Sequence, residues 1–340
     1  MVPVLRPVPD LRVRVWGGTR LGAPTAAGPI GEAWVAGPTS RLPGPPGAAG
    51  PTLDELASRL GRELVGRASP WPDRFPLLVK LVDTAEWLSV QVHPDDATAR
   101  RLAGPGAVGK TEAWFVLDAA PGAELLVGIR AGVPAEQVRA AIGGGGLTAL
   151  LERVAPSPGD TILVPAGTLH AVGPGVFLYE LQQPSDLTYR ADDWGRPATP
   201  QRPLHVDETL ASWDPSTAPL MARPPAGPLV PRHELVECRQ FVMELLAPGD
   251  GLMARGPGDG GPDAIAPGAV ALDPGGVTPH VLTALARSRV VVEGAGWREE
   301  LGPLESIVVA ASAGPYRVAA AGSGAAGSGP AIALLARLPG

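Results

Sequence analysis

Apolar residues in this sequence cluster in short runs that are bounded by glycine and proline. Runs rich in valine, leucine and isoleucine lie at 75–82, 87–93, 111–117 and 161–164. Short apolar runs between turn-forming residues are typical of buried β-strands, whereas a helix needs a longer segment with apolar residues three and four positions apart. The pattern therefore predicts a mostly β protein.

Helical spacing occurs in only a few segments, all of them in the first two thirds of the chain. Leucines recur at three- and four-residue steps after Thr52, and Thr52 with Glu55 can form a capping box. These features predict a helix from Thr52 to about Val65. Further short helices are expected at 95–103, 134–142, 147–154 and 207–213.

A stretch rich in proline and alanine at 215–231 is interpreted as a linker between two domains. We expect a catalytic domain at 1–214, with short helices inserted among its strands, and a second domain at 232–340. The second part consists almost entirely of predicted short strands. It carries no Gln-x-His or His-x-His pair, and its histidines, His233 and His280, stand alone. We therefore expect it to be structural and non-catalytic.

Composition and charge narrow the class of protein. The 340 residues include 45 Gly and 41 Pro, which would suggest disorder if valine, leucine and isoleucine did not fill the segments between them. The formal net charge is −6 with acidic and basic residues mixed, so no nucleic-acid partner is expected. The opening residues lack the apolar core of a signal peptide, and no apolar run is long enough to span a membrane. With a single cysteine, Cys238, the chain is expected to be soluble and cytoplasmic, with no membrane partner.

Candidate chemistry gathers on three of the predicted strands. Gln91 and His93 lie two residues apart, so their side chains share one face of a strand. Burying a glutamine amide is costly unless its oxygen has a strong partner, and a divalent cation is such a partner. Glu112 begins another strand, and His170 follows the run 161–164 and a turn containing proline and glycine. All four side chains could reach one barrel interior.

These four side chains form a nitrogen- and oxygen-donor set without sulfur. Such a set suits Zn²⁺ and would also suit iron, manganese or cobalt. These protein ligands would not fill the coordination sphere of the metal, so water or substrate could also bind to it, as catalytic zinc requires. Lys80 and Lys110, the only lysines of the sequence, flank this region. Since arginine serves elsewhere, each lysine marks a position that favours a compact ammonium.

Three sequence blocks resemble those of a known family. The spacing of Pro165 and Gly167 before His170 resembles the second metal-binding motif of the cupin superfamily. The blocks Gln91-Val92-His93-Pro94-Asp95-Asp96 and Gly109-Lys110-Thr111-Glu112-Ala113-Trp114 resemble those of type I phosphomannose isomerases. Other cupins carry His-x-His in the first motif instead. The sequence is therefore similar to the short bacterial form of that family.

The resemblance implies a fold of two cupin-type β-barrels of the jelly-roll kind, with a few short helices inserted in the N-terminal half. It also implies interconversion of mannose 6-phosphate and fructose 6-phosphate through a cis-enediol, with one Zn²⁺ per chain. The family's active-site arginine corresponds to Arg190. The family's metal ligands correspond to Gln91, His93, Glu112 and His170.

Charged side chains near the metal are expected to bind the sugar phosphate. Arg190 and Lys110 are the expected catalytic cations, since either could hold the phosphate or stabilise an enediolate. Glu180 and Asp186 follow His170 by ten and sixteen residues and are expected to bind substrate together with the two cations. The base that moves the C2 proton stays open among Lys110, Glu180 and Asp186.

Two functions of other classes stay open beside this one. An iron-dependent cupin oxygenase would use a similar set of histidine and glutamate ligands, but it usually needs no cluster of phosphate-binding cations. A non-catalytic sugar-binding cupin would need no open metal position. Metal content and turnover of mannose 6-phosphate together separate the three. The expected partner is a small sugar phosphate, and the chain could be a monomer or a homodimer.

Overall fold

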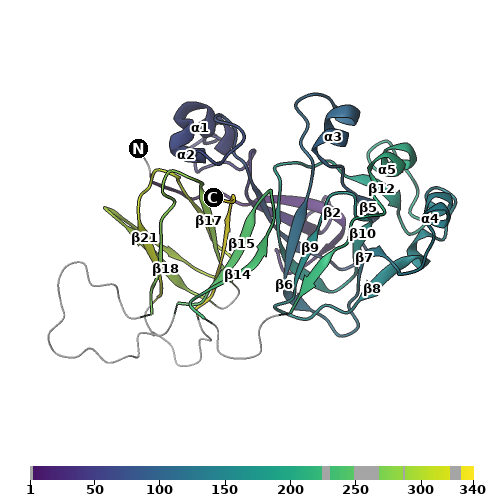
Figure 1. Cartoon of the computed structure of the whole chain (residues 1–340). Coiled ribbons are helices and arrows are strands. Elements are labelled where there is room, and N and C mark those ends of the chain that lie inside the picture. Colours follow the sequence, from purple (N-terminus) through teal and green to yellow (C-terminus); the bar gives the residue numbers. More distant parts are fainter. Residues whose placement is uncertain (1–2, 224–229, 249–267, 286–287, 322–330) are drawn as a thin grey trace. The chain divides into compact units, whose positions relative to one another are not determined.

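Antiparallel β-sheet dominates the computed structural model, which describes residues 3–223, 230–248, 268–285, 288–321 and 331–340 (Figure 1). Within these residues there are four sheets and five α-helices. The expected mostly β class is confirmed. None of the described helices is long and apolar enough to cross a membrane.

The chain divides into two compact units. The motif unit, which contains the candidate metal ligands, comprises Asp10–Trp34 and Leu78–Pro224, and the C-terminal unit comprises Met1–Pro9, Val35–Leu77 and Pro225–Gly340. Two N-terminal segments therefore group with the C-terminal strands, although the sequence-based division assigned them to the first domain. The assignment of one domain as catalytic and the other as structural stays a prediction.

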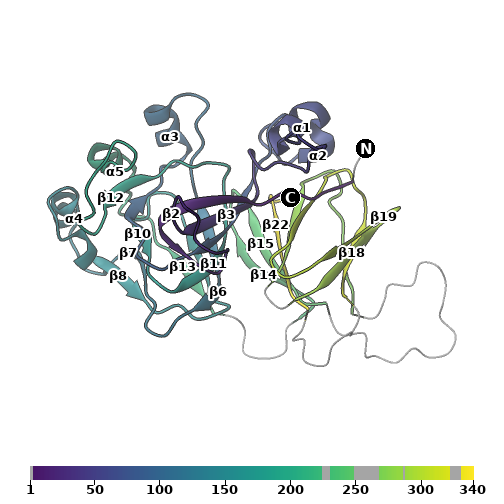
Figure 2. The ribbon, with the colours of Figure 1, turned by 180° about the vertical axis from the view of Figure 1, so that it is seen from behind.

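The motif unit is built from two sheets and three helices. Its strands are β2 (Asp10–Gly18), β3 (Ile30–Ala36), β4 (Leu78–Asp83), β5 (Val90–Val92), β6 (Glu112–Ala119), β7 (Leu125–Ile129), β8 (Leu151–Val154), β9 (Thr161–Val164), β10 (His170–Val172), β11 (Val176–Gln182), β12 (Tyr189–Asp192) and β13 (Leu220–Ala222). The helices are α3 (Asp96–Ala103), α4 (Ala135–Ala141) and α5 (Val206–Ser212), with a 3-10 turn, η1 (Leu147–Ala149). The sheet orders are β13-β9-β6-β11-β4-β3-β2 and β12-β5-β10-β7-β8. Figure 2 shows β2, β3 and β11 of the seven-stranded sheet from behind.

Side chains of the five-stranded sheet alternate between two apolar cores. On β7, Leu125 and Val127 pack in a core shared with the seven-stranded sheet, whereas Leu126 packs in a core with residues of α4 and α5. Figure 1 shows α4 and α5 beside this sheet. Because side chains alternate along a strand, every second residue of β5, β10 and β12 is directed to the interior between the two sheets.

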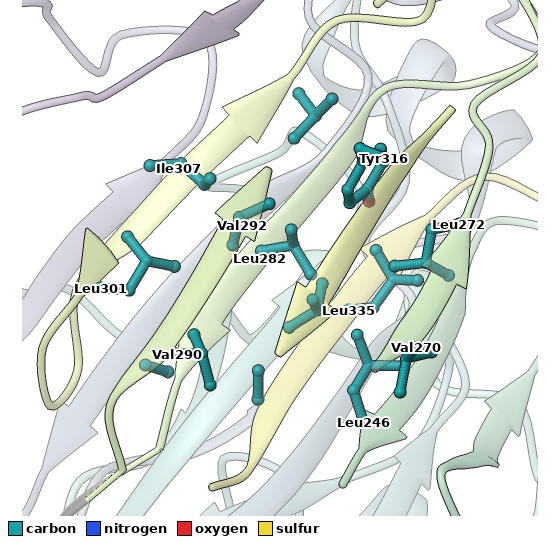
Figure 3. Packing of buried hydrophobic residues seen from close by; sticks show 14 of the residues in the cluster. Leu246, Val270, Leu272, Leu282, Val290, Val292, Leu301, Ile307, Tyr316 and Leu335 are labelled. Carbon is teal, nitrogen blue, oxygen red and sulfur yellow. The ribbon is translucent and has the colours of Figure 1, made fainter. Parts of the chain in front are cut away.

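The C-terminal unit also contains two sheets around one apolar core. Its helices are α1 (Leu53–Leu60) and α2 (Arg62–Val65), and its strands are β1 (Val4–Leu5), β14 (Arg232–Glu237), β15 (Val242–Leu246), β16 (Val270–Leu272), β17 (His280–Ala284), β18 (Val290–Gly294), β19 (Trp297–Leu301), β20 (Ser306–Val309), β21 (Tyr316–Ala320) and β22 (Ala333–Arg337). The sheet orders are β1-β20-β17-β22-β15-β14 and β16-β21-β18-β19. Figure 3 shows Leu246, Leu282 and Leu335 of the first sheet packed with Val292 and Tyr316 of the second.

Most of the predicted helices are present, with differences at their ends. The capping box is confirmed, since Thr52 and Glu55 exchange hydrogen bonds of 2.9 and 3.0 Å. Gly61, with φ of 56°, divides the predicted helix into α1 and α2. The helix predicted at 147–154 is wrong beyond its first residues, because η1 is followed by β8, which pairs with β7.

The predicted linker at 215–231 is partly a strand. Within it, β13 pairs antiparallel with β9, which extends the seven-stranded sheet by one strand. Its residues 224–229 lie outside the described part of the chain. In the second part of the sequence, β17 and β19 are strands that the apolar pattern did not predict. β17 pairs with β20 and β22, which lie further along the chain, and β19 pairs with β18 through a short turn.

Candidate metal centre and its cavity

Three residues form one row across the five-stranded sheet of the motif unit. Arg190 of β12 lies opposite Gln91 of β5, and Gln91 lies opposite His170 of β10. Their neighbours along the strands, such as Val92 and Ala171, pack in the core with α4 and α5. The alternation therefore directs the row to the interior, and a strand spacing of about 4.8 Å keeps its members within reach of one another.

The seven-stranded sheet presents charged groups to the same interior. Glu112 of β6 shares a strand face with Trp114 and Val116, which pack in the core between the two sheets. On the neighbouring strands, Glu180 of β11 lies opposite Lys80 of β4. Both sheets thus place polar side chains beside the apolar core that they share.

The predicted metal ligands converge between the sheets. Oε2 of the buried Glu112 lies 3.3 Å from Nε2 of His93, and Oε1 lies 3.3 Å from Nε2 of His170. Nε2 of Gln91 lies 3.2 Å from Nε2 of His170. In the described residues, His93, Glu112 and His170 form a group that could hold a metal ion, with one ligand atom of each within 4.8 Å of the others.

Backbone carbonyl groups fix the orientation of both imidazole rings. Nδ1 of His93 lies 2.8 Å from the oxygen of Leu187, and Nδ1 of His170 lies 2.9 Å from the oxygen of Thr168. A carbonyl oxygen only accepts, so each Nδ1 carries the hydrogen and each Nε2 presents a lone pair to Glu112. This is the tautomer in which histidine binds a metal through Nε2.

The arrangement of lone pairs around Glu112 favours a cation. Its buried Oε1 has no hydrogen-bond partner among the described residues, and the atom that it faces, Nε2 of His170, is also an acceptor. On the other side, the ammonium of Lys110 lies 2.6 Å from Oε2 of Glu112 and 2.9 Å from Nε2 of His93. The ammonium of Lys110 thus brings a positive charge to Oε2 of Glu112 and Nε2 of His93. Among the described residues, no positive charge lies against Oε1 of Glu112 and Nε2 of His170. The residues present therefore fit a divalent cation.

Burial sets the protonation state of the cluster. It lowers the pKa of His93 to about 3, with nearby Lys110 acting in the same direction, and it lowers the pKa of His170. Burial alone would raise the pKa of Glu112, but the ammonium of Lys110 holds it well below its ordinary value. At neutral pH the cluster presents neutral imidazoles and a charged carboxylate, which is the state that metal binding requires.

A glycine turn joins two of the candidate ligands. Gly167 has φ of 91°, in the left-handed region that favours glycine, and its N–H donates to the backbone oxygen of His93 over 2.8 Å. A Cβ at this position would lie 2.9 Å from Cβ of Asp214. Gly167 therefore ties the hairpin that carries His170 to the strand end that carries His93, which is the physical reason for the Pro-x-Gly spacing.

A cavity of about 550 Å³ opens beside this cluster, within the usual range for small-molecule sites. Gln91 and Lys110 line it, and so do the other three residues expected to contact substrate, Glu180, Asp186 and Arg190. The residues predicted from the sequence thus gather in one place. The chemical role of each stays a prediction.

The cavity also contains ion pairs that the sequence did not reveal. Nζ of Lys80 lies 3.1 Å from Oε2 of Glu180, and Arg14 lies 2.9 Å from Glu32. Burial alone would raise the pKa of Glu32, but Lys80 and Arg14 lower it to about 2. Gly31 leaves room for this arrangement, since a Cβ there would lie 2.6 Å from Cβ of Arg14. The sequence had singled out Lys80 through the rarity of lysine and Glu180 through its distance from His170, but it did not indicate that the two would pair.

Sequence comparisons point to one family. Residues 19–107 match the family model for the catalytic domain of type I phosphomannose isomerase. A mannose-6-phosphate isomerase of Streptococcus mutans serotype c is 39% identical over 214 residues, which are 59% of this chain and 65% of that protein. The chain thus matches slightly less than two thirds of that relative's length.

Solved structures extend the similarity of fold to nearly the whole chain. The mannose 6-phosphate isomerase from Bacillus subtilis aligns with 98% of this chain and 99% of its own, with a TM-score of 0.76 and 24% identity. A zinc-bound mannose 6-phosphate isomerase aligns with 99% of this chain and 100% of its own, with a TM-score of 0.67 and 16% identity. With the motifs, these findings show that the chain is similar in sequence to type I phosphomannose isomerases over part of its length and shares the fold of solved mannose 6-phosphate isomerases.

Proposed function

We propose that the protein interconverts mannose 6-phosphate and fructose 6-phosphate. The observation that carries this proposal is the buried cluster of His93, Glu112 and His170, which lies beside a cavity lined by Gln91, Lys110 and Arg190. Metal ligands next to cations suit a substrate that carries both a reactive carbonyl and a phosphate. The relative from Streptococcus mutans, named a mannose-6-phosphate isomerase, supports the same reaction.

One divalent cation would be held by Gln91, His93, Glu112 and His170, and zinc is the ion that we propose. A half-turn of the Gln91 amide would present its oxygen in place of its nitrogen. The zinc-bound relative supports this choice of metal. When bound, the ion supplies positive charge that polarises the sugar carbonyl and stabilises the developing oxyanion.

Two cations of the chain are proposed to act on charge in the substrate. Arg190 lies opposite Gln91 in the row and lines the cavity, and its planar guanidinium can donate two hydrogen bonds to an enediolate oxygen or to the phosphate. The ammonium of Lys110 is held at the cluster by Glu112 and can donate to a sugar oxygen there. Both charges would stabilise the anionic enediol more strongly than the neutral sugar.

Glu180 is proposed as the base that takes the proton from C2 and returns it to C1. Burial raises the pKa of Glu180 although Lys80 opposes the shift, and a carboxylate with a raised pKa removes such a proton more readily. Contacts of 3.1 Å to Lys80 and 3.3 Å to Nε1 of Trp114 hold the carboxylate in place. Asp186 lines the same cavity and is proposed to bind sugar hydroxyl groups.

The finer architecture is part of the same proposal. In each unit two sheets share an apolar core, which supports two cupin-type β-barrels of the jelly-roll kind. We infer that the first domain, 1–214, is catalytic and that the second, 232–340, is not. We also infer a cytoplasmic location for the enzyme.

Assays of chelated and zinc-restored protein on mannose 6-phosphate test the proposal. We expect about one divalent ion per chain, loss of fructose 6-phosphate formation on chelation, and recovery with zinc. Oxygen consumption that depends on iron, without isomerisation, would indicate a cupin oxygenase instead. Binding of the sugar phosphate without turnover would indicate a non-catalytic sugar-binding protein.

A further inference from the structure

His205 belongs to none of the recognised motifs, yet it is bonded to both backbone groups of Arg190. The N–H of Arg190 donates to Nδ1 of His205 over 3.1 Å, and the N–H of His205 donates to the oxygen of Arg190 over 2.9 Å. Strand β12 lies at the edge of the five-stranded sheet, so these bonds take the place of a further strand. The side chain of His205 thus supplies an acceptor that a strand would supply from its backbone.

The segment before His205 holds the guanidinium of Arg190 as well. Nη1 of Arg190 donates to the oxygen of Pro203 over 2.7 Å. The ring of His205 packs edge-on against Tyr189, with ring centroids 5.8 Å apart. The backbone carbonyl of His205 accepts a hydrogen bond from the N–H of Thr209 in α5. His205 therefore joins α5 to the strand position that carries Arg190.

The hydrogen bond requires one state of the imidazole ring. Nδ1 accepts only when the ring is neutral and its hydrogen is on Nε2. Burial lowers the pKa of His205, and the charge of Arg190 acts in the same direction, so the ring is neutral at neutral pH. His205 also lines the cavity that Gln91 and Arg190 line.

We propose that His205 is a positioning residue of the isomerase, which fixes the backbone of Arg190 so that its guanidinium lies at the metal cluster. This inference rests on the proposed function, because the guanidinium is given its role by that reaction. A reacting group that moves by about 1 Å can lose about 10² in rate. On this account His205 acts through Arg190 and does not itself contact the reacting atoms.

Three substitutions separate the acceptor at Nδ1 from the rest of the ring. Asparagine places an oxygen close to the position of Nδ1, glutamine places one closer to Nε2, and alanine places none. We expect kcat to fall about 10²-fold in His205→Ala and His205→Gln, with KM within about threefold, and to stay within about fivefold of wild type in His205→Asn. Equal losses in His205→Asn and His205→Gln, or wild-type kcat in all three variants, would overturn the inference.

A double substitution tests the route through Arg190. If His205 acts through that residue, His205→Ala should cost nothing more in an Arg190→Ala background, whereas independent effects would multiply. Multiplied losses, or loss of metal from His205→Ala, would contradict the positioning role. The matched control is His233→Ala in the C-terminal unit, which should keep wild-type kinetics.

The two proposals fail in different ways. An inactive, zinc-loaded wild-type protein overturns the proposed function, and the role of His205 falls with it. An active wild-type protein with unaffected His205 variants overturns the positioning role alone.

Discussion

Replacement of Arg190 tests whether the row of residues across β12, β5 and β10 acts as one site. Arg190→Ala removes the guanidinium and its bond to the oxygen of Pro203. The two bonds to His205 use the backbone of Arg190 and persist in the variant. The perturbation is therefore confined to the side chain, and the metal ligands keep their contacts.

The expected magnitude follows from the contacts that are lost. Removal of one donor to a developing oxyanion lowers kcat by about 10²–10³, which corresponds to about 2.7–4 kcal/mol of transition-state stabilisation. The half-buried Pro203 carbonyl can bond to water instead, so the free energy of unfolding should fall by only about 1 kcal/mol. Arg190→Lys keeps the charge but loses the planar pair of donors, so its kcat should lie between those of Arg190→Ala and the wild type.

Steady-state kinetics with mannose 6-phosphate, together with metal analysis, check this prediction. A fall in kcat with unchanged metal content supports an interaction made in the transition state. A rise in KM with kcat preserved would show that Arg190 only binds the phosphate, because binding common to ground and transition states would have been removed. If a folded Arg190→Ala protein keeps both constants near wild type, Arg190 has no role in the site.

Three further predictions concern the metal, the C-terminal unit and acid stability. His170→Ala should reduce the metal content from about one ion per chain to nearly none, and full zinc content by elemental analysis would refute the site. His280→Ala should leave kcat within a few-fold of wild type, and a hundred-fold loss in a folded protein would reveal a second site. Burial, with Arg337 acting in the same direction, lowers the pKa of His280 to about 3. The unfolded state, with a histidine pKa of about 6.5, then binds more protons, so stability is present above pH ~6.5 and is lost as the pH falls toward 3, by up to about 1.4 kcal/mol per pH unit. His280→Leu should flatten the fall in Tm over that range, and an unchanged slope would contradict the argument.

Part of the candidate metal cluster could be predicted from the sequence because the spacing within its motifs is encoded locally. Gln91 and His93 share a strand face through their spacing of two, and Gly167 is required by the turn that places His170 beside His93. The strand spacing and the glycine turn are local, whereas the bond from Gly167 to the backbone of His93 joins positions 74 residues apart. A motif read along the chain therefore contains most of the information about the ligand set.

The ion pairs of the cavity depend on strand register, which no local pattern contains. Lys80 meets Glu180 because β4 and β11 pair in one particular register, although the two residues are 100 positions apart. The error at 147–154 has the same origin. Leu151–Val154 has an apolar spacing that fits a helix, but pairing with β7 makes it a strand, since tertiary contacts override a weak local preference.

The use of lysine shows that composition can locate a site even where the strand register cannot be predicted from the sequence. The ammonium of Lys110 fits between Glu112 and His93 at 2.6 and 2.9 Å, and that of Lys80 is buried at 3.1 Å from Glu180. A guanidinium is a wider, planar group, and its fork could not occupy either space without moving the carboxylate. In a chain where every other long cationic side chain is arginine, the two lysines stand where a compact charge must lie beside a buried carboxylate. The same reasoning explains why the sequence singled out Lys80 without revealing its partner. The choice of lysine over arginine is visible at position 80 itself, whereas the pairing with Glu180 depends on the register of β4 and β11.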